Sequence, residues 1–129
     1  MRCVTAALSA LMSVVCAGNQ AAAQFSVPVA APDGAILFAR QCGTCHVAAA
    51  GGETRQGPNL WGVVGRRAGS VAGFKYGGAF AASGIVWNET TLDAYLTNPQ
   101  AVVAGSVMAY RQANPDIRAR IIAWLKDQH

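Results

Sequence analysis

Apolar positions recur at helical spacing in the last part of the chain. They fall every three or four residues, at Ile117, Ile121, Trp124 and Leu125. Asn114 can cap the first turn through its side-chain oxygen, and Pro115 takes the first helical position, where proline is favoured. The pattern predicts a final helix that packs on one face.

Two shorter helices are predicted upstream. Asp33 can cap a helix that begins at Gly34 and carries an apolar stripe that includes Phe38. Asn88 can cap a second helix, which ends before Pro99 because proline lacks a backbone donor and disfavours helix in the residue before it.

The segment 47–84 is rich in glycine and holds few helical runs. A loop of this length is uncommon inside a compact domain, and a large rigid group at its centre would explain it. The sequence shows no strand pattern and no internal repeat. We therefore expect a small, all-α, loop-rich fold.

Residues 1–23 have the pattern of a secretory signal peptide. Arg2 precedes an apolar stretch from Val4 to Val15, and Ala21-Ala22-Ala23 gives a cleavage site after Ala23. A retained anchor is the alternative, but the apolar stretch is shorter than the roughly 20 residues that a spanning helix needs. A lipoprotein modified at Cys16 is disfavoured, because valine precedes that cysteine where a small residue is expected.

The remaining chain fits one domain, formed by residues 33–129 after an irregular lead-in at residues 24–32. The formal net charge is +4, but the basic residues are scattered, with Arg66-Arg67 as the only adjacent pair, so we expect no nucleic-acid binding. The hydrophobic share of 53% is inflated by the leader and by alanines. We expect a monomer with no stable membrane insertion after cleavage.

Cys42-Gly43-Thr44-Cys45-His46 is a C-x-x-C-H run, the attachment signature of a c-type haem. Two thiols three residues apart can each add to a vinyl group of one porphyrin, while the adjoining imidazole is held against the iron. A thioredoxin-like dithiol is disfavoured by His46 and by the missing alternation of strands and helices. A zinc site would need further cysteines or paired histidines.

Met108 is the natural sixth ligand of such an iron. Met1 and Met12 lie in the leader, and His129 ends the chain, where residues are usually poorly ordered. A methionine is more often a core residue than a ligand, but the haem motif favours the interpretation of Met108 as a ligand. His/Met ligation raises the reduction potential of a haem and suits an electron carrier.

From Asp33 to Lys126 the chain resembles the class I cytochrome c family. The likeness is carried, besides the haem motif, by Gly34, Phe38, Gly57-Pro58-Asn59-Leu60-Trp61-Gly62-Val63-Val64-Gly65-Arg66, Phe74-Lys75-Tyr76, Ile85-Val86-Trp87, Leu92, Tyr95-Leu96, Asn98-Pro99 and Met108. The resemblance implies a class I cytochrome c fold wrapped around one haem c.

The resemblance also implies how the iron is held. Cys42 and Cys45 would hold the haem covalently, and His46 would ligate the iron through one ring nitrogen. The Pro58 carbonyl would accept a hydrogen bond from the other ring nitrogen and so fix the tautomer. Met108 would close the sixth position.

The remaining site residues are assigned by the same resemblance. Tyr95 would help Met108 to keep small ligands out. Arg66, Tyr76 and Trp87 would hydrogen-bond or neutralise the haem propionates, and Ser106 would join them. Leu60, Phe38, Leu96 and Trp124 would form core walls.

Two departures from the family pattern stand out. Ala104 occurs where the family usually has proline, which predicts a looser methionine loop and easier release of Met108 at high pH. Lysine is scarce: Gln100, Ala101 and Val107 stand where basic residues are common, so docking should depend less on salt than in strongly basic relatives.

The function we expect is one-electron transfer in the periplasm of a Gram-negative bacterium, by transient docking with redox proteins. The donor would be a bc complex or a periplasmic dehydrogenase, and the acceptor an oxidase, a reductase or a reaction centre. Val63-Val64 or Val102-Val103 could form part of a protein-binding face. The alternative is a haem enzyme or gas sensor with an open sixth iron site, which the placement of Met108 and the lack of a distal histidine disfavour.

Overall fold

The computed structural model of the chain describes residues 33–77 and 79–129. The predicted signal peptide at residues 1–23 and the lead-in at residues 24–32 lie outside the described residues. Within the described part, the elements follow in the order α1 (Gly34–Gln41), the 3-10 helix η1 (Ala81–Ser83), α2 (Glu89–Thr97), α3 (Pro99–Val102) and α4 (Pro115–Lys126). None of these helices is long and apolar enough to cross a membrane.

The starts of α1, α2 and α4 lie where the sequence predicts them, because each of these three helices has its own capping side chain. Asp33 Oδ1 accepts a hydrogen bond from the backbone N–H of Ala35 at 2.7 Å. Asn88 and Thr91 form a reciprocal capping box at the start of α2. Asn114 accepts from the first turn of α4, whose first position is the predicted proline.

Two short elements, α3 and η1, are not predicted from the sequence. Pro99 is the first residue of α3 and also the reason that α2 stops before it. Proline suits the first turn of a helix, and it disfavours helical backbone in the residue that precedes it. The 3-10 helix η1 lies inside the predicted glycine-rich loop. Among the described residues the β pairing is a single isolated bridge between Arg67 and Val86, so the all-α, loop-rich prediction is confirmed.

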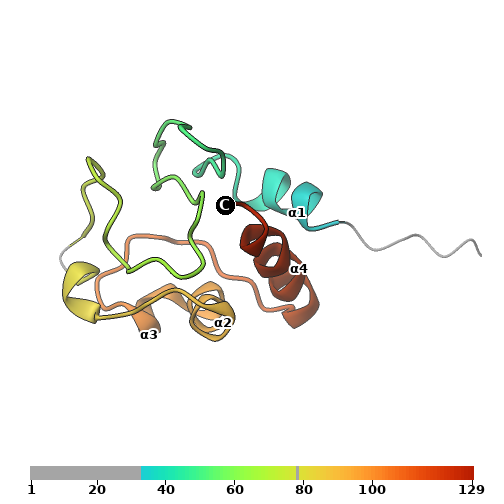
Figure 1. Cartoon of the computed structure of the whole chain (residues 1–129). Coiled ribbons are helices and arrows are strands. Elements are labelled where there is room, and N and C mark those ends of the chain that lie inside the picture. Colours follow the sequence, from blue (N-terminus) through green and yellow to red (C-terminus); the bar gives the residue numbers. More distant parts are fainter. Residues whose placement is uncertain (1–32, 78) are drawn as a thin grey trace, which may run out of the picture.

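The first and last helices pack against each other, as Figure 1 shows at the side of the molecule where the described chain begins. Phe38 of α1 and Trp124 of α4 meet with their ring centroids 4.6 Å apart. Gly34 permits this approach: a Cβ built on it would lie 2.6 Å from Trp124 Cβ and would also collide with the carbonyl oxygen of Arg120. The crossing therefore depends on a residue without a side chain.

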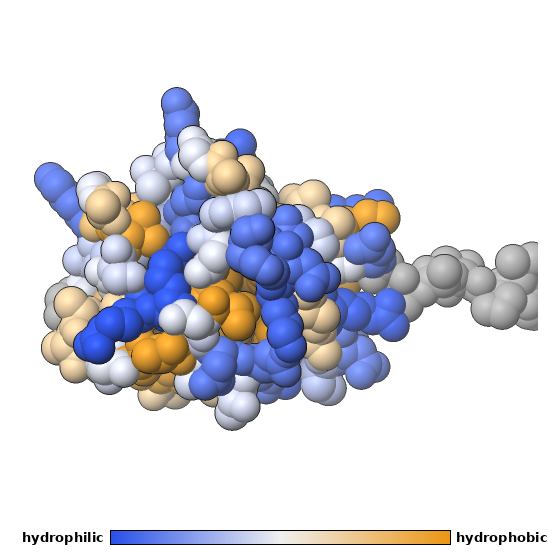
Figure 2. Space-filling model, in the orientation of Figure 1, coloured by the Kyte–Doolittle hydropathy of each residue, from blue (hydrophilic) through white to orange (hydrophobic). Residues whose placement is uncertain are grey.

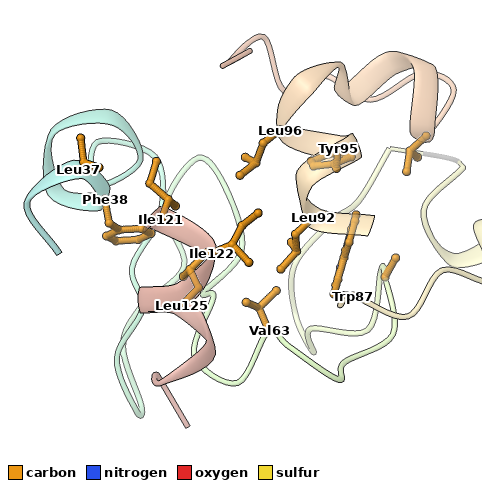
Figure 3. Packing of buried hydrophobic residues seen from close by; sticks show 12 residues of the cluster. Leu37, Phe38, Val63, Trp87, Leu92, Tyr95, Leu96, Ile121, Ile122 and Leu125 are labelled. Carbon is orange, nitrogen blue, oxygen red and sulfur yellow. The ribbon is translucent and has the colours of Figure 1, made fainter. Parts of the chain in front are cut away.

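The core is continuous from this crossing to α2. Figure 3 shows Leu37 and Phe38 facing Ile121, with Ile122, Leu92 and Val63 beyond them. Val63 is 2% exposed and Val103 is 1% exposed. For Val63 and Val103 the predicted contribution to a protein-binding face is therefore wrong, because both side chains are buried in the core. Val64 and Val102, the other members of the two predicted pairs, are half-buried and pack against that core.

Backbone hydrogen bonds hold the long loop against the helices. The N–H of Gly62 donates to the carbonyl of Gln128 at 2.6 Å, beyond the end of α4. The N–H of Gly65 donates to Trp87, and that of Ala68 donates to Ile85. The loop is thus fixed at its middle and joined to the chain that enters α2.

Replacing Gly34 by alanine tests the helix crossing. Alanine is favoured over glycine inside a helix by about 1 kcal/mol, so propensity alone predicts stabilisation. The contacts with Trp124 and Arg120 predict instead that Gly34→Ala lowers the free energy of unfolding by about 1–3 kcal/mol. Urea unfolding of the haem-loaded protein measures the difference.

The matched control is Arg40→Ala, at an exposed position of the same helix, with an expected change within about 0.5 kcal/mol. A Gly34→Ala protein as stable as wild type would show that the two helices can separate at no cost.

Candidate haem-binding site

A cavity of about 560 Å³ opens between the helices and the long loop. Its size falls within the range of about 300–1,000 Å³ typical of ligand pockets. All the side chains predicted for the haem site line it: Cys42, Cys45, His46, Pro58, Arg66, Tyr76, Trp87, Tyr95, Ser106 and Met108. Figure 2 shows apolar residues at the centre of this face, surrounded by polar ones.

The haem motif follows directly on α1. The N–H of Cys42, the C-cap of α1, donates to Phe38 at 2.8 Å, and the N–H of His46 donates back to Cys42 at 2.9 Å, so the motif is folded as turns that follow the helix. The Cys42 and Cys45 thiols are not joined by a disulfide. Burial, and after it the nearby Cys45, raises the pKa of the Cys42 thiol to about 11.

His46 is held in one tautomer by Pro58. Its Nδ1 lies 2.9 Å from the Pro58 carbonyl oxygen, which can only accept, so Nδ1 carries the proton. Burial lowers the pKa of His46, and the Pro58 hydrogen bond opposes this in part. A neutral imidazole with its Nδ1 engaged offers the lone pair of Nε2 as a metal ligand.

Met108 reaches the same cavity from the other end of the domain's sequence. It follows a turn in which the N–H of Ser106 donates to Val103 at 3.0 Å and Gly105 has a φ of +76°. Met108 is half-buried, whereas the neighbouring Val107 is 87% exposed. Burial therefore alternates along this segment, although Val107 as well as Met108 lines the cavity.

Tyr95 and Ser106 form a buried pair. The Tyr95 hydroxyl and Ser106 Oγ are 2.7 Å apart, and the ring of Tyr95 packs edge-on against Trp87 at 5.0 Å. Burial raises the pKa of Tyr95, opposed by the Ser106 hydrogen bond. The resemblance implies separate roles for these two residues, and the structure shows that each is the other's polar partner.

Arg66 and Tyr76 contribute polar atoms on the side of the long loop. Arg66 donates from its two terminal nitrogens to the carbonyls of Trp61 and Asn59, at 2.7 and 3.0 Å. Burial lowers the pKa of Arg66, and Tyr76 acts in the opposite direction. Among the described residues no carboxylate pairs with this half-buried guanidinium. A cavity with such a cation at its wall suits a ligand that carries negative groups.

A row of aromatic rings was only partly foreseen. Ring centroids are 4.7 Å apart for Phe74 and Tyr76, 5.3 Å for Tyr76 and Phe80, and 6.1 Å for Phe80 and Tyr95. Phe80, which the sequence analysis did not name, thus joins the loop to α2. Its only signal was a large aromatic residue in a stretch of glycine and alanine.

Gly57, the residue before Pro58, allows the imidazole of His46 to pack directly against the backbone. A Cβ built on Gly57 would overlap the imidazole and lie 2.7 Å from Nε2. The cavity thus combines apolar walls, aromatic rings, two thiols, a neutral imidazole and a thioether. These residues fit a haem: an apolar macrocycle with two vinyl groups, two propionates and an iron that takes His and Met ligands.

Fold and cavity together define a small helical protein of the covalent-haem class. The chain is 43% identical over 94 residues to a cytochrome c of Chlamydomonas reinhardtii, and the matched region covers 72% of this chain and 84% of the relative. It is 45% identical over 91 residues to a cytochrome c2 of Rhodomicrobium vannielii, covering 70% of this chain and 73% of that one. It is 39% identical over 98 residues to a cytochrome c-550 of Novispirillum itersonii, covering 67% and 88%.

No family model matches the chain. The likeness to the curated relatives is nevertheless sufficient, and the chain belongs to the class I cytochrome c family. It is an electron carrier rather than an enzyme, and it binds one covalent haem c.

Replacing Gly57 by alanine should displace His46. The added methyl group would occupy the space of the imidazole, so we expect Gly57→Ala to lower the free energy of unfolding of the haem-loaded protein by about 1–3 kcal/mol. The low-spin absorption spectrum should be weakened or lost. Arg40→Ala, at an exposed position that does not line the cavity, is the control. A Gly57→Ala protein that behaves like this control would mean that the His46 ring adjusts freely.

The Tyr95–Ser106 pair should show a measurable coupling energy. In a double-mutant cycle with Tyr95→Phe and Ser106→Ala, we expect about 1 kcal/mol in urea unfolding, the value of a buried neutral hydrogen bond. In a parallel cycle with Tyr110→Phe and Ser106→Ala, we expect a coupling energy near zero, because the Tyr110 hydroxyl donates to Gln41 instead.

The same pair determines part of the alkaline stability. The pKa of Tyr95 is raised above its unfolded value of about 10. The contribution of Tyr95 to the free energy of unfolding is therefore present below pH 10 and is lost as pH rises through the folded pKa. Tyr95→Phe should therefore flatten the alkaline limb of the stability profile. An unchanged slope would show that Tyr95 does not titrate differently in the folded state.

Proposed function

We propose that this protein carries single electrons between redox proteins in a bacterial periplasm. The haem would be attached through Cys42 and Cys45, and its iron held by His46 and Met108. One observation carries the proposal: a histidine fixed by the Pro58 carbonyl and a methionine line the same cavity as the two thiols.

Each side chain of the cavity would have a separate task in this mechanism. Haem iron supplies one-electron chemistry between its ferric and ferrous states. The Pro58 carbonyl keeps the Nδ1 proton on His46, which leaves Nε2 free to bind metal. A thioether and a neutral imidazole are both uncharged ligands, so neither adds a charge that would have to be buried.

The polar residues of the wall would accommodate the propionates and exclude water. Arg66, Tyr76 and Trp87 would bind the two carboxylates with their N–H and O–H groups. Tyr95 and Ser106 satisfy each other's hydrogen-bonding capacity within the buried wall. A wall whose polar atoms are already paired gives little anchorage to an entering ligand.

The periplasmic location rests on the sequence. Residues 1–23 have the pattern of a secretory signal, and thioether attachment of haem in such systems takes place outside the cytoplasm. Two of the relatives, a cytochrome c2 and a cytochrome c-550, come from bacteria. We infer that cleavage after Ala23 releases a monomer that consists of a short lead-in and the haem domain.

Partners would dock transiently at the rim of the cavity. Val107 is exposed there, and Lys75 lies at the same rim, whereas Lys126 is paired with Glu89 at 2.5 Å. With one lysine at the rim, docking would depend less on salt than in strongly basic relatives. The donor would be a bc complex or a periplasmic dehydrogenase, and the acceptor an oxidase, a reductase or a reaction centre.

Optical spectra of the protein loaded with haem in a bacterial periplasm test the ligation. We expect a low-spin c-type spectrum with the near-infrared iron–sulfur band when oxidised, and no change on adding carbon monoxide after reduction with dithionite. Met108→Ala should abolish the band and permit carbon monoxide to bind. The neighbouring Val107→Ala, at an exposed position, should behave as wild type.

A high-spin wild-type spectrum that shifts with carbon monoxide would contradict the proposal. It would mean that Met108 does not bind the iron and would favour the gas-sensor alternative.

A further inference from the structure

The segment that carries Met108 has little backbone structure of its own. It follows α3, and its internal ties are the hydrogen bonds from Val103 N–H to Pro99 at 2.9 Å and from Ser106 N–H to Val103 at 3.0 Å. Ala104 leaves the backbone freer than proline would. Neither of these two bonds involves Met108 itself, so something else must hold that residue if it is to keep one position.

The side chain of Gln100 bridges this segment. Its Nε2 amide group donates to the carbonyl oxygen of Ser106 at 3.1 Å and to that of Met108 at 2.7 Å. A primary amide has two N–H donors, so both bonds can form at once. Gln100 belongs to α3, and it therefore ties the far end of the loop back to the element from which the loop starts.

Arg111 fixes the orientation of that amide. Its Nη2 donates to Gln100 Oε1 at 2.8 Å. A guanidinium has donors only, so the amide oxygen must face Arg111 and the amide nitrogen must face the two carbonyls. The reverse orientation would place an oxygen against two acceptors and an N–H group against a cation. The bond is charge-assisted, which makes it stronger than the two neutral ones.

We propose that Gln100, oriented by Arg111, is a positioning residue that keeps Met108 at the iron. The inference rests on the proposed ligation by Met108 and goes beyond it. The tie acts on the carbonyl of Met108, so it holds the backbone from which the thioether extends. It also compensates for the missing proline: the freedom that Ala104 allows is restricted by two side-chain hydrogen bonds.

Displacement of Met108 by imidazole in the ferric protein at neutral pH provides the test. An external ligand can bind only when Met108 leaves, so its apparent affinity reports how firmly the methionine is held. Gln100→Leu has a similar shape but no donor. We expect it to keep the iron–sulfur band without imidazole and to bind imidazole about tenfold more tightly, as the loss of two hydrogen bonds would give.

Arg111 variants separate positioning from general destabilisation. Arg111→Met should raise imidazole affinity about threefold, because the amide loses its orientation, whereas Arg111→Lys should restore most of the wild-type value. The double variant Gln100→Leu/Arg111→Met should match Gln100→Leu alone, since Arg111 acts through the glutamine. Arg111 is exposed, so its substitution leaves the core intact even if Gln100→Leu fails to fold.

Gln128→Leu is the matched control. Its amide also donates to a backbone carbonyl, that of Trp124 at 3.0 Å, but it does not line the cavity. It should bind imidazole as wild type does. Suppose that Gln100→Leu keeps the iron–sulfur band and binds imidazole with wild-type affinity, or that Arg111→Met does so if the first variant does not fold. That result would overturn the role of Gln100 and leave the proposed ligation by Met108 intact. A wild-type protein without that band would overturn the proposed ligation and with it the premise of the inference.

Discussion

The short helices of this chain cannot complete a core among themselves, and the rest of the structure follows from that constraint. Helices α1, α2, α3 and α4 have 8, 9, 4 and 12 residues. Isolated helices shorter than about 12–15 residues are marginal in water, so these depend on tertiary packing. The packing they achieve leaves a cavity of about 560 Å³ in the middle of the domain. An apolar prosthetic group adds buried surface where the chain itself is too short to provide it.

The long loop then acts as the second wall of the site rather than as a connection. Its glycines allow close approaches, as Gly57 does beside His46. Its polar groups are taken up by backbone and side-chain partners, among them the two carbonyls that accept from Arg66. The same guanidinium reaches the cavity, so one residue both closes the loop and presents a positive charge to the ligand.

Side-chain amides supply much of the remaining order around the site. Gln100 ties the methionine segment, and Gln41 accepts from both Tyr110 and Gln112, which joins the end of α1 to the chain beyond Met108. Amide groups are neutral at every pH, so the ties from Gln100 to backbone carbonyls do not depend on protonation. Their number fits a chain whose lysines are few.

The sequence by itself determined the elements that depend on local chemistry. Each capping residue bonds to a backbone group only a few positions away, as Asp33, Asn88 and Asn114 do. The C-x-x-C-H motif for haem attachment likewise consists of five consecutive residues. Such signals need no knowledge of the rest of the fold. Resemblance to a family added the residues that meet in the cavity, including the partnership of His46 and Pro58.

Only the tertiary structure decided how distant residues pair. Tyr110 and Gln41 are 69 positions apart, and nothing in their neighbours indicates that they meet. The valines at 63 and 103 look like surface candidates in the sequence, yet they lie in the core. Tyr95 with Ser106, and Gln100 with Arg111, are likewise pairs of polar residues whose partners are selected by the path of the backbone. A polar side chain can bond to many groups, and which one it meets depends on the packing of the whole chain.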